Sequence, residues 1–387
     1  MNYSNNPFSN FPWVEYNHRL GRYMVSPQRL SMYLTGSNSP VILKAVEDLA
    51  RTRPTIFRYA NGYYYPVSWN KLNGLIKRFM PPELRTSRNV KDVIYEIETE
   101  RSVPRDAFDS DEDIVNFTNG IYHISSGALT KHTPKVLSSI QIPCKFDADL
   151  TLERDAPVFS KYLNDLTSGD ALDQTFLLEY IGAILSNVPG YRFKKCLFLV
   201  GRGDTGKSQL RQLVSSLIGS ANCQTIDLSK LNDRFSTSQL YGIRLGGSGD
   251  VASIRVQEMA TLKNLTGGDD VNAEYKGKDA FSFKYRGFLW FNANDLPPFG
   301  GDRGKHVYDR FSIIQCNNVI SPEHQDKELL DKLMKEKDAI ASVSIKYLAA
   351  AVKRGYTFTE SESMIASREE YMERNNSLVV FVRDRCE

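Results

Sequence analysis

The feature that most constrains this chain is the stretch LFLVGRGDTGKSQL at residues 197–210, where an apolar run leads into a glycine-rich loop. The loop matches the pattern G-x-x-x-x-G-K-[ST] with Gly201, Gly206, Lys207 and Ser208. Backbone amides can close around phosphate oxygens where glycine leaves room, and the N-terminus of a following helix adds positive potential. The stretch therefore predicts a strand, a phosphate-binding loop and a helix within an α/β core.

The same loop predicts a nucleoside triphosphate and Mg²⁺ as ligands. Lys207 would reach the β- and γ-phosphates, and the hydroxyl of Ser208 would bind Mg²⁺. A GTPase would need N-K-x-D for guanine, and NAND at 292–295 lacks the lysine, so we expect ATP. The residues expected to contact the nucleotide are Gly201, Arg202, Gly203, Asp204, Thr205, Gly206, Lys207, Ser208 and Gln209.

Composition narrows the class of protein. With 387 residues and 41% hydrophobic content, the chain can form two or three globular domains. The net charge is only +3, so contact with nucleic acid would depend on a local group of basic residues. The N-terminal residues lack the apolar core of a signal peptide, and the cysteines form no C-x-x-C pair. We expect a soluble protein of the reducing cytoplasm, with no membrane contact.

Changes in sequence pattern predict five regions. Residues 1–40 lack periodicity, which is typical of an irregular or partly ordered arm, and the run VILKAVEDLA that follows is expected to be helical. Asn61-Gly62 between two β-prone runs indicates a hairpin, and NVKDVIYEIETER has the apolar spacing of a helix. The expected regions are a 1–40 arm, a 41–150 α+β domain, a 151–190 helical connector, a 191–320 α/β core and a 321–387 helical segment.

Four short apolar runs after the phosphate loop are strand candidates of the core, at 241–245, 281–283, 287–292 and 311–316. Helices are expected from Ser321-Pro322 to Asn375, and SLVVFVRDRCE is expected to begin another. Because that last run has no C-terminal stop signal, we expect a further small domain beyond residue 387.

Three polar residues follow the loop in an order that suits ATP hydrolysis. Asp250 comes after a short strand, where a carboxylate that organises Mg²⁺ belongs. Asn294 ends the apolar run GFLWFNAND, where it would sense the γ-phosphate and hold the attacking water. Arg310 stands at the entrance of the next strand and suits the stabilisation of transferred charge from a neighbouring subunit.

These motifs resemble those of the superfamily 3 AAA+ helicases of the phage, plasmid and poxvirus primase-helicase family. The match is closest to the replication initiator (Rep) helicases of staphylococcal pathogenicity islands and related mobile elements. The similar stretches are FTNGIYHISSGALTKHTP, LEYIGAILSNVPGYRFKKCLFLVGRGDTGKS, LKNLTGGDDVNAEYKGK and NANDLPPFGGDRGKHVYDRF. The resemblance implies an AAA+ core, a hexameric ring, ATP-driven DNA unwinding and a winged-helix domain after the motor.

The sequence departs from that family at the second acidic motif and leaves two roles open. GGSGDVAS offers only Asp250, so either this carboxylate serves both metal and water, or another one, with Glu258 the nearest candidate, is the base. Arg303 lies in a glycine-rich stretch and competes with Arg310 for the role of the arginine finger.

The run AEYKGKDAF is expected to form a hairpin with Gly277 at its tip and Lys276 and Lys278 beside it. The resemblance implies that this hairpin projects into the ring channel and that its lysines grip DNA through phosphates, without reading sequence. The expected partners are single-stranded DNA in the channel, origin duplex, further copies of the chain and a primase or loading protein. The alternative is a signalling or scaffold NTPase that switches assembly without moving DNA.

Overall fold

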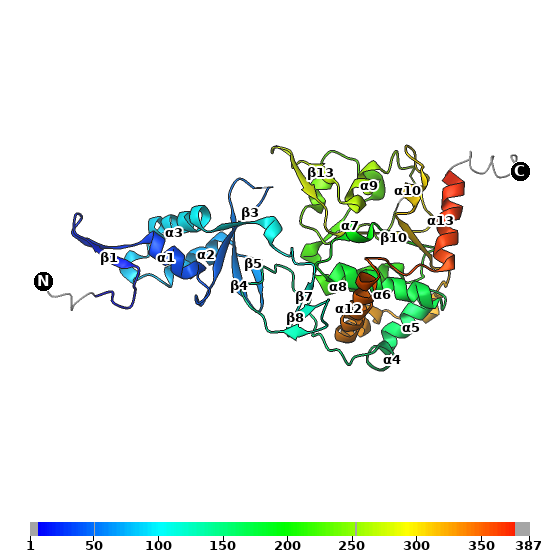
Figure 1. Cartoon of the computed structure of the whole chain (residues 1–387), viewed down its shortest axis with the longest axis horizontal. Coiled ribbons are helices and arrows are strands. Elements are labelled where there is room, and N and C mark those ends of the chain that lie inside the picture. The colour runs from blue at the N-terminus through cyan, green and yellow to red at the C-terminus, as the bar shows by residue number, and fades with distance from the viewer. Residues whose placement is uncertain (1–6, 50, 252–253, 376–387) are drawn as a thin grey trace, which may run out of the picture. The chain divides into compact units, whose positions relative to one another are not determined.

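The computed structural model describes residues 7–49, 51–251 and 254–375, which form two compact units (Figure 1). The first unit contains residues up to 110 together with 132–140, and the second contains 111–131 and 141 onward. These boundaries differ from the expected 41–150 domain, because the segment around 111–131 packs with the second unit. None of the described helices is long and apolar enough to cross a membrane.

The first unit is built on a four-stranded sheet in the order β5-β4-β3-β6. The strands are β3 (Leu43–Glu47), β4 (Thr55–Ala60), β5 (Tyr63–Pro66) and β6 (Ser102–Pro104). Asn61 and Gly62 turn between β4 and β5 with φ of 54° and 91°, which confirms the hairpin expected from this pair. Helices α2 (Trp69–Lys77) and α3 (Ser87–Glu100) follow, and α3 buries the apolar face expected from its spacing.

Two expectations for the first unit are wrong. The described residues 7–40 are not an irregular or partly ordered arm: they contain β1 (Val14–Asn17), β2 (Arg22–Val25) and α1 (Pro27–Thr35), and Leu30 and Leu34 are fully buried. The cap of α1 is local, because Ser26 accepts from the amide of Arg29 and proline opens the helix. The run VILKAVEDLA contains strand β3, not a helix, since pairing on both sides buries it within the sheet.

The second unit contains a five-stranded sheet in the order β11-β12-β15-β10-β16, with every pairing parallel. Its strands are β11 (Cys223–Thr225), β12 (Leu245–Gly247), β15 (Phe288–Ala293), β10 (Cys196–Val200) and β16 (Phe311–Gln315). Because the strands are parallel, their carboxyl ends meet at one edge, where α/β proteins bind ligands.

Strand β12 begins at Leu245, the last residue of the run 241–245 in which a strand is expected. The two glycines of β12 explain this difference. A Cβ on Gly246 would meet the side chain of Leu240 at 2.7 Å, and one on Gly247 would overlap the backbone of Trp290. Glycine is the residue that fits between these neighbours. The sequence pattern indicated only the apolar run that precedes these glycines.

Helices cover the parallel sheet. Helix α6 (Ala171–Leu185) is buried along most of its length, and α12 (Lys337–Lys353) packs against it.

The helix expected from Ser321 is a short 3₁₀ turn at Pro322–His324, and the first full C-terminal helix, α11, begins at Leu329. The fourth helix, expected in SLVVFVRDRCE, lies outside the described residues. The remaining elements of this unit are β7 (Ile114–Phe117), β8 (Gly120–His123), β9 (Leu129–Thr130), α4 (Leu152–Asp155), α5 (Pro157–Leu166), α7 (Gly190–Phe193), α8 (Lys207–Ile218), α9 (Ala260–Gly267), β13 (Asp270–Ala273), β14 (Phe281–Lys284), α10 (Lys305–Tyr308), α11 (Leu329–Lys335) and α13 (Glu362–Asn375).

Candidate nucleotide-binding site

The glycine-rich loop connects β10 to α8, as its sequence predicts. Gly201 and Gly206 have φ of 150° and 92°, which favour glycine. A Cβ on Gly201 would overlap the backbone of Cys316, and one on Gly206 would lie 3.0 Å from the ring of Tyr162. At Gly203 a Cβ would meet no atom within 4 Å. The outer two glycines are therefore required by the protein's own packing, whereas Gly203 keeps the outer side of the loop open.

The Lys207 side chain lies folded into the loop. Its Nζ donates to the carbonyl oxygens of Gly201 and Arg202, both at 2.7 Å, and to the hydroxyl of Thr205 at 3.0 Å. Burial lowers the pKa of this ammonium, and the carboxylate charge of Asp250 opposes that shift. The glycine-rich loop thus surrounds a positive charge, and Asp250 is close enough to influence it.

Tyr162 supports the loop from α5, and sequence reasoning did not identify it. Its hydroxyl donates to the carbonyl oxygen of Gly206 at 2.8 Å, and its side chain is almost fully buried. The apolar spacing of α5 marks this position only as part of a helix face. Nothing local in the sequence indicates a contact with a loop 44 residues away.

Asp250 and Asn294 follow neighbouring strands at the carboxyl edge of the sheet. The amide of Val251 donates to the carbonyl oxygen of Asn292 at 2.9 Å, which holds Asp250 beside the end of β15. Asp250 and Asn294 are both exposed. Asp250, Asn294 and the loop of Lys207 therefore all lie at the carboxyl edge of the parallel sheet. Glu258 is also exposed, and the structure does not choose between it and Asp250 as the base.

A second asparagine, Asn292, was not singled out by its sequence. It is 1% exposed in β15, opposite Leu199 of β10, and its Oδ1 accepts from the indole of Trp290 at 2.8 Å. Its Nδ2 has no hydrogen-bond partner among the described residues. A buried amide donor without a partner is costly, so Asn292, whose strand partner Leu199 lies two residues before Gly201, is a further candidate for a polar role in this site.

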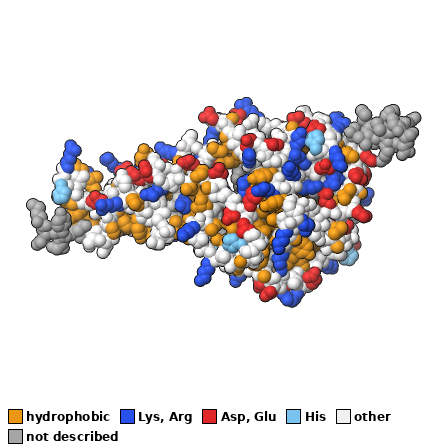
Figure 2. All heavy atoms as spheres, viewed as in Figure 1, with side chains coloured by type: hydrophobic (Ala, Val, Ile, Leu, Met, Phe, Trp, Pro, Cys, Tyr) orange, Lys and Arg blue, Asp and Glu red, His pale blue; other side chains and the backbone are white. Residues whose placement is uncertain are grey.

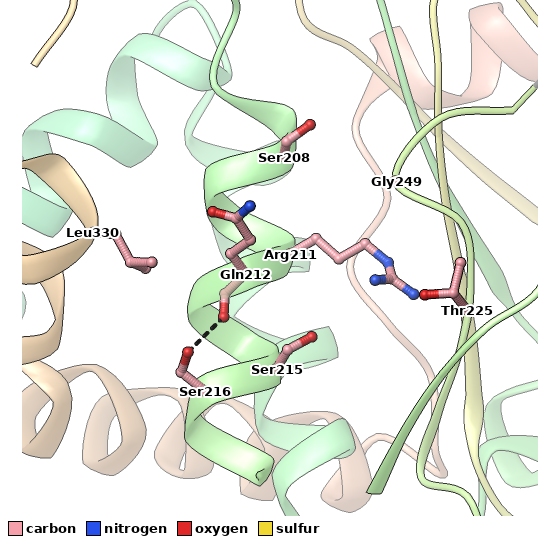
Figure 3. Close-up of a pocket in the computed structure, with 8 residues that line it drawn as sticks. All are labelled: Ser208, Arg211, Gln212, Ser215, Ser216, Thr225, Gly249 and Leu330. Carbon is pink, nitrogen blue, oxygen red and sulfur yellow. Dashed lines mark hydrogen bonds between the residues drawn. The ribbon is translucent and has the colours of Figure 1, made fainter. Parts of the chain in front are cut away.

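A hollow of about 560 Å³ lies beside the first turns of α8 (Figure 3). Ser208 and Gly249 line the same hollow, and Asp250 directly follows Gly249 in the chain. One carboxylate and one hydroxyl, completed by phosphates and water, suit Mg²⁺, which keeps part of its hydration shell. Its lining residues are Ser208, Arg211, Gln212, Ser215, Ser216, Thr225, Gly249 and Leu330.

Arg310 lies at the opposite edge of the sheet from the phosphate loop. Its carbonyl oxygen accepts from the amide of Cys196, the first residue of β10, whereas the loop follows the last. The five residues of β10 separate the two edges of the sheet by roughly 16 Å, at the usual rise per residue of a strand. The Arg310 Nη1 atom donates to the Thr266 hydroxyl at 3.0 Å, and burial lowers the pKa of its guanidinium. The backbone of Arg310 thus lies at the edge of the sheet away from the loop of its own chain, and its guanidinium contacts α9.

The competing arginine has a different environment. The Nη1 atom of Arg303 donates to the carbonyl oxygen of Asn375 in α13 at 2.8 Å. This bond ties Arg303 to the end of a helix of its own chain.

The expected hairpin is formed by β13 and β14, which pair antiparallel with Gly277 in the connection. Lys276 and Lys278 are exposed, and the Lys278 ammonium lies 5.6 Å from the ring centre of Tyr275. Arg234 forms an ion pair at 2.8 Å with Glu274, where the connection between the two strands begins. Basic and acidic side chains are interspersed over the face of the molecule in Figure 2.

Comparison with known proteins gives matches to two family models and to a viral putative helicase. Residues 59–168 match the family model "D5 N terminal like", and residues 199–310 match a family of unknown function, DUF5906. Putative helicase 184R of Invertebrate iridescent virus 6 is 28% identical over 211 residues, which is 50% of this chain and 21% of the viral protein. The chain therefore spans about a fifth of the length of the curated relative that it matches.

Solved structures support the fold. The NrS-1 C terminal region matches with a TM-score of 0.55 at 14% identity, covering 91% of this chain and 76% of that one. Another structure of the same region gives a TM-score of 0.55 at 17% identity. At these identities the match concerns the arrangement of the chain alone.

Proposed function

We propose that this chain is the ATP-driven motor of a DNA helicase, of the superfamily 3 AAA+ kind, that serves replication initiation by a mobile genetic element. The support is the matched D5-like segment, the viral helicase relative and the phosphate loop in a parallel sheet. The observation that carries the proposal is the separation of Arg310 from its own loop. A finger at the far edge of the sheet suits a site completed by a second copy.

In this proposal the chain's own groups divide the work of hydrolysis. Lys207 leaves its carbonyl partners to bind the β- and γ-phosphates, while backbone amides of the loop orient the chain of phosphates. Mg²⁺, held by Ser208 and Asp250, would neutralise charge on the phosphate oxygens. Asn294 would hold the attacking water, and Arg310 of an adjoining copy would stabilise the charge that develops on transfer.

Ring assembly, with a hexamer as the expected form, would place the hairpins around a channel. Lys276 and Lys278 would then contact phosphates of single-stranded DNA, which carry no sequence information. Opening and closing of the shared ATP sites would move these hairpins and pull one strand through. Origin duplex and a primase or loading protein are the further partners in this proposal, and the bacterial cytoplasm is its setting.

The alternative is a signalling or scaffold NTPase in which the nucleotide only controls assembly. The exposed lysine pair at the tip of a hairpin favours the motor, because a switch needs no such group.

Two assays separate these functions. The ATPase rate is measured with and without single-stranded DNA, and strand separation is measured on a forked duplex. The motor predicts faster hydrolysis with DNA and separated strands. An unchanged rate with an intact fork would reject the motor and favour the switch. A Lys207→Ala protein should lose hydrolysis under both functions, so it serves only to show that the activity belongs to this site.

A further inference from the structure

The last turn of α13 binds the loop that follows β15. Tyr371, Arg374 and Asn375 are spaced by three and four residues, so they share one face of the helix. Figure 1 shows α13 at the side of the second unit, near α10, and contacts join these two helices. All three side chains bond to the segment at 295–299.

Two of these contacts are buried. The hydroxyl of Tyr371 donates to the carbonyl oxygen of Pro297 at 2.6 Å, and the amide of Phe299 donates to Oδ1 of Asn375 at 3.2 Å. Tyr371 and Asn375 are 5% and 8% exposed, so loss of either contact would leave a buried polar group without its partner.

The third contact is more exposed. Arg374 donates to the carboxylate of Asp295 at 2.8 Å and to the carbonyl oxygen of Leu296 at 3.0 Å. Since half of the arginine side chain and most of the aspartate are exposed, water and salt weaken this pair. The buried contacts of Tyr371 and Asn375 therefore contribute most to holding the segment 295–299 in place.

The loop that they hold begins directly after Asn294. It continues to Arg303, which donates to the carbonyl oxygen of Asn375, and leads through α10 to Arg310. Asn294 is exposed and lies past the last residue of its strand, so the sheet alone does not fix it. A polar group that positions water must be held within a fraction of an ångström by its surroundings.

We propose that Tyr371 and Asn375 are positioning residues that fix the Asn294 loop for hydrolysis, so that the end of α13 controls the rate of the chemical step. The inference rests on the proposed function, because it assigns a role in the ATPase reaction. It also makes a physical claim that does not need activity: the loop at 295–303 is ordered by α13.

The test compares Asn375→Ala and Tyr371→Phe with the wild-type chain. We expect kcat for ATP to fall about tenfold to a hundredfold, as for a misplaced catalytic group, while KM stays close to its original value. Hydrogen exchange should be faster in the loop at 295–303 and unchanged in the phosphate loop. Combining Asn375→Ala with Asn294→Ala should cost little more than Asn294→Ala alone, because the first residue acts through the second.

Ser361→Ala is the matched control. Ser361 accepts from the amide of Met364 and donates to the buried Asp173, so this variant loosens the start of α13 without touching the loop. An equal fall in kcat for the control, additive effects in the double variant, or unchanged exchange in the loop would overturn the inference. A wild-type chain that hydrolyses no ATP would overturn the proposed function instead, and the exchange result would still decide whether α13 orders the loop.

Discussion

The hydroxyl of Tyr162 donates a hydrogen bond to the carbonyl oxygen of Gly206 at 2.8 Å, and the tyrosine ring packs against the same glycine. This contact joins α5 to the residue that precedes Lys207. Since Gly206 has φ of 92°, its peptide orientation is unusual and depends on such neighbours. The phosphate loop is therefore shaped from outside as well as by its own sequence.

Tyr162→Phe is expected to weaken ATP binding about fivefold. The variant removes one buried hydrogen bond, worth about 1 kcal/mol, and frees the Gly206 peptide to rotate. The measurement is the Kd of a fluorescent ATP analogue. Tyr180→Phe is the control, because the Tyr180 hydroxyl also donates to a backbone carbonyl, that of Leu289, at 2.7 Å. Equal Kd changes in both variants would show that the effect is general destabilisation.

Local patterns in the sequence were enough to predict several parts of this fold. The phosphate loop, the Asn61-Gly62 turn and the buried face of α3 each depend on residues close together in the chain. Helix caps, turn residues and apolar periodicity act over a few residues, so they can be interpreted without the tertiary structure. The strand that carries the loop was predicted for the same reason.

Features that depend on distant contacts could not be predicted. The glycines of β12 are explained by the backbone of Trp290 and the side chain of Leu240. Tyr162 looks like an ordinary residue of an amphipathic helix until α5 is seen beside the loop. The arm expected at residues 1–40 contains a hairpin and a helix because their side chains share a core with α3. The roles of Asp250, Asn294, Arg310 and the two hairpin lysines stay predictions.

The hairpin lysines are expected to contribute to DNA affinity through phosphate contacts. Replacing both Lys276 and Lys278 by alanine should weaken single-stranded DNA binding and lower the slope of log K against log salt by about 1.4, since each phosphate contact contributes about 0.7. Fluorescence anisotropy over a range of salt concentrations measures both quantities. Lys284→Ala is the control, since Lys284 is exposed at the base of the same hairpin. A slope unchanged by the double variant would remove these lysines from the DNA interface.

The buried carboxyl of Asp173 is expected to make stability depend on pH. Burial raises its pKa above the ordinary value of 3.8, although the hydroxyl of Ser361 opposes the shift. The folded state therefore holds the proton more tightly than the unfolded state does. The resulting stabilisation is complete when the pH lies below the pKa of the unfolded state, and it is lost as the pH rises through the pKa of the folded state. Asp173→Asn should lack this loss.

Thermal unfolding measured from about pH 4 to about pH 7 tests this expectation. The melting temperature of Asp173→Asn should rise relative to that of the wild-type chain as the pH increases. Glu153→Gln, which changes an exposed carboxylate, should show no such trend. If the melting temperatures of Asp173→Asn and the wild type changed with pH in parallel, the pKa of Asp173 would be the same in the folded and the unfolded state.

Arg310 provides the sharpest test of a site shared between copies. Its guanidinium bonds to Thr266 and its backbone lies at the edge of the sheet opposite the phosphate loop. Lys207→Ala and Arg310→Ala should each abolish hydrolysis, because one lacks the phosphate contact and the other lacks the finger. When the two variants are mixed, an Arg310→Ala copy retains Lys207, and an adjoining Lys207→Ala copy supplies Arg310. Part of the ATPase rate should therefore return, in proportion to the mixed interfaces.

Thr266→Val, which removes the partner of Arg310 within its own chain, should keep hydrolysis. Mixed assemblies confirmed by native mass spectrometry that remain inactive would contradict a site completed by the finger of a second copy.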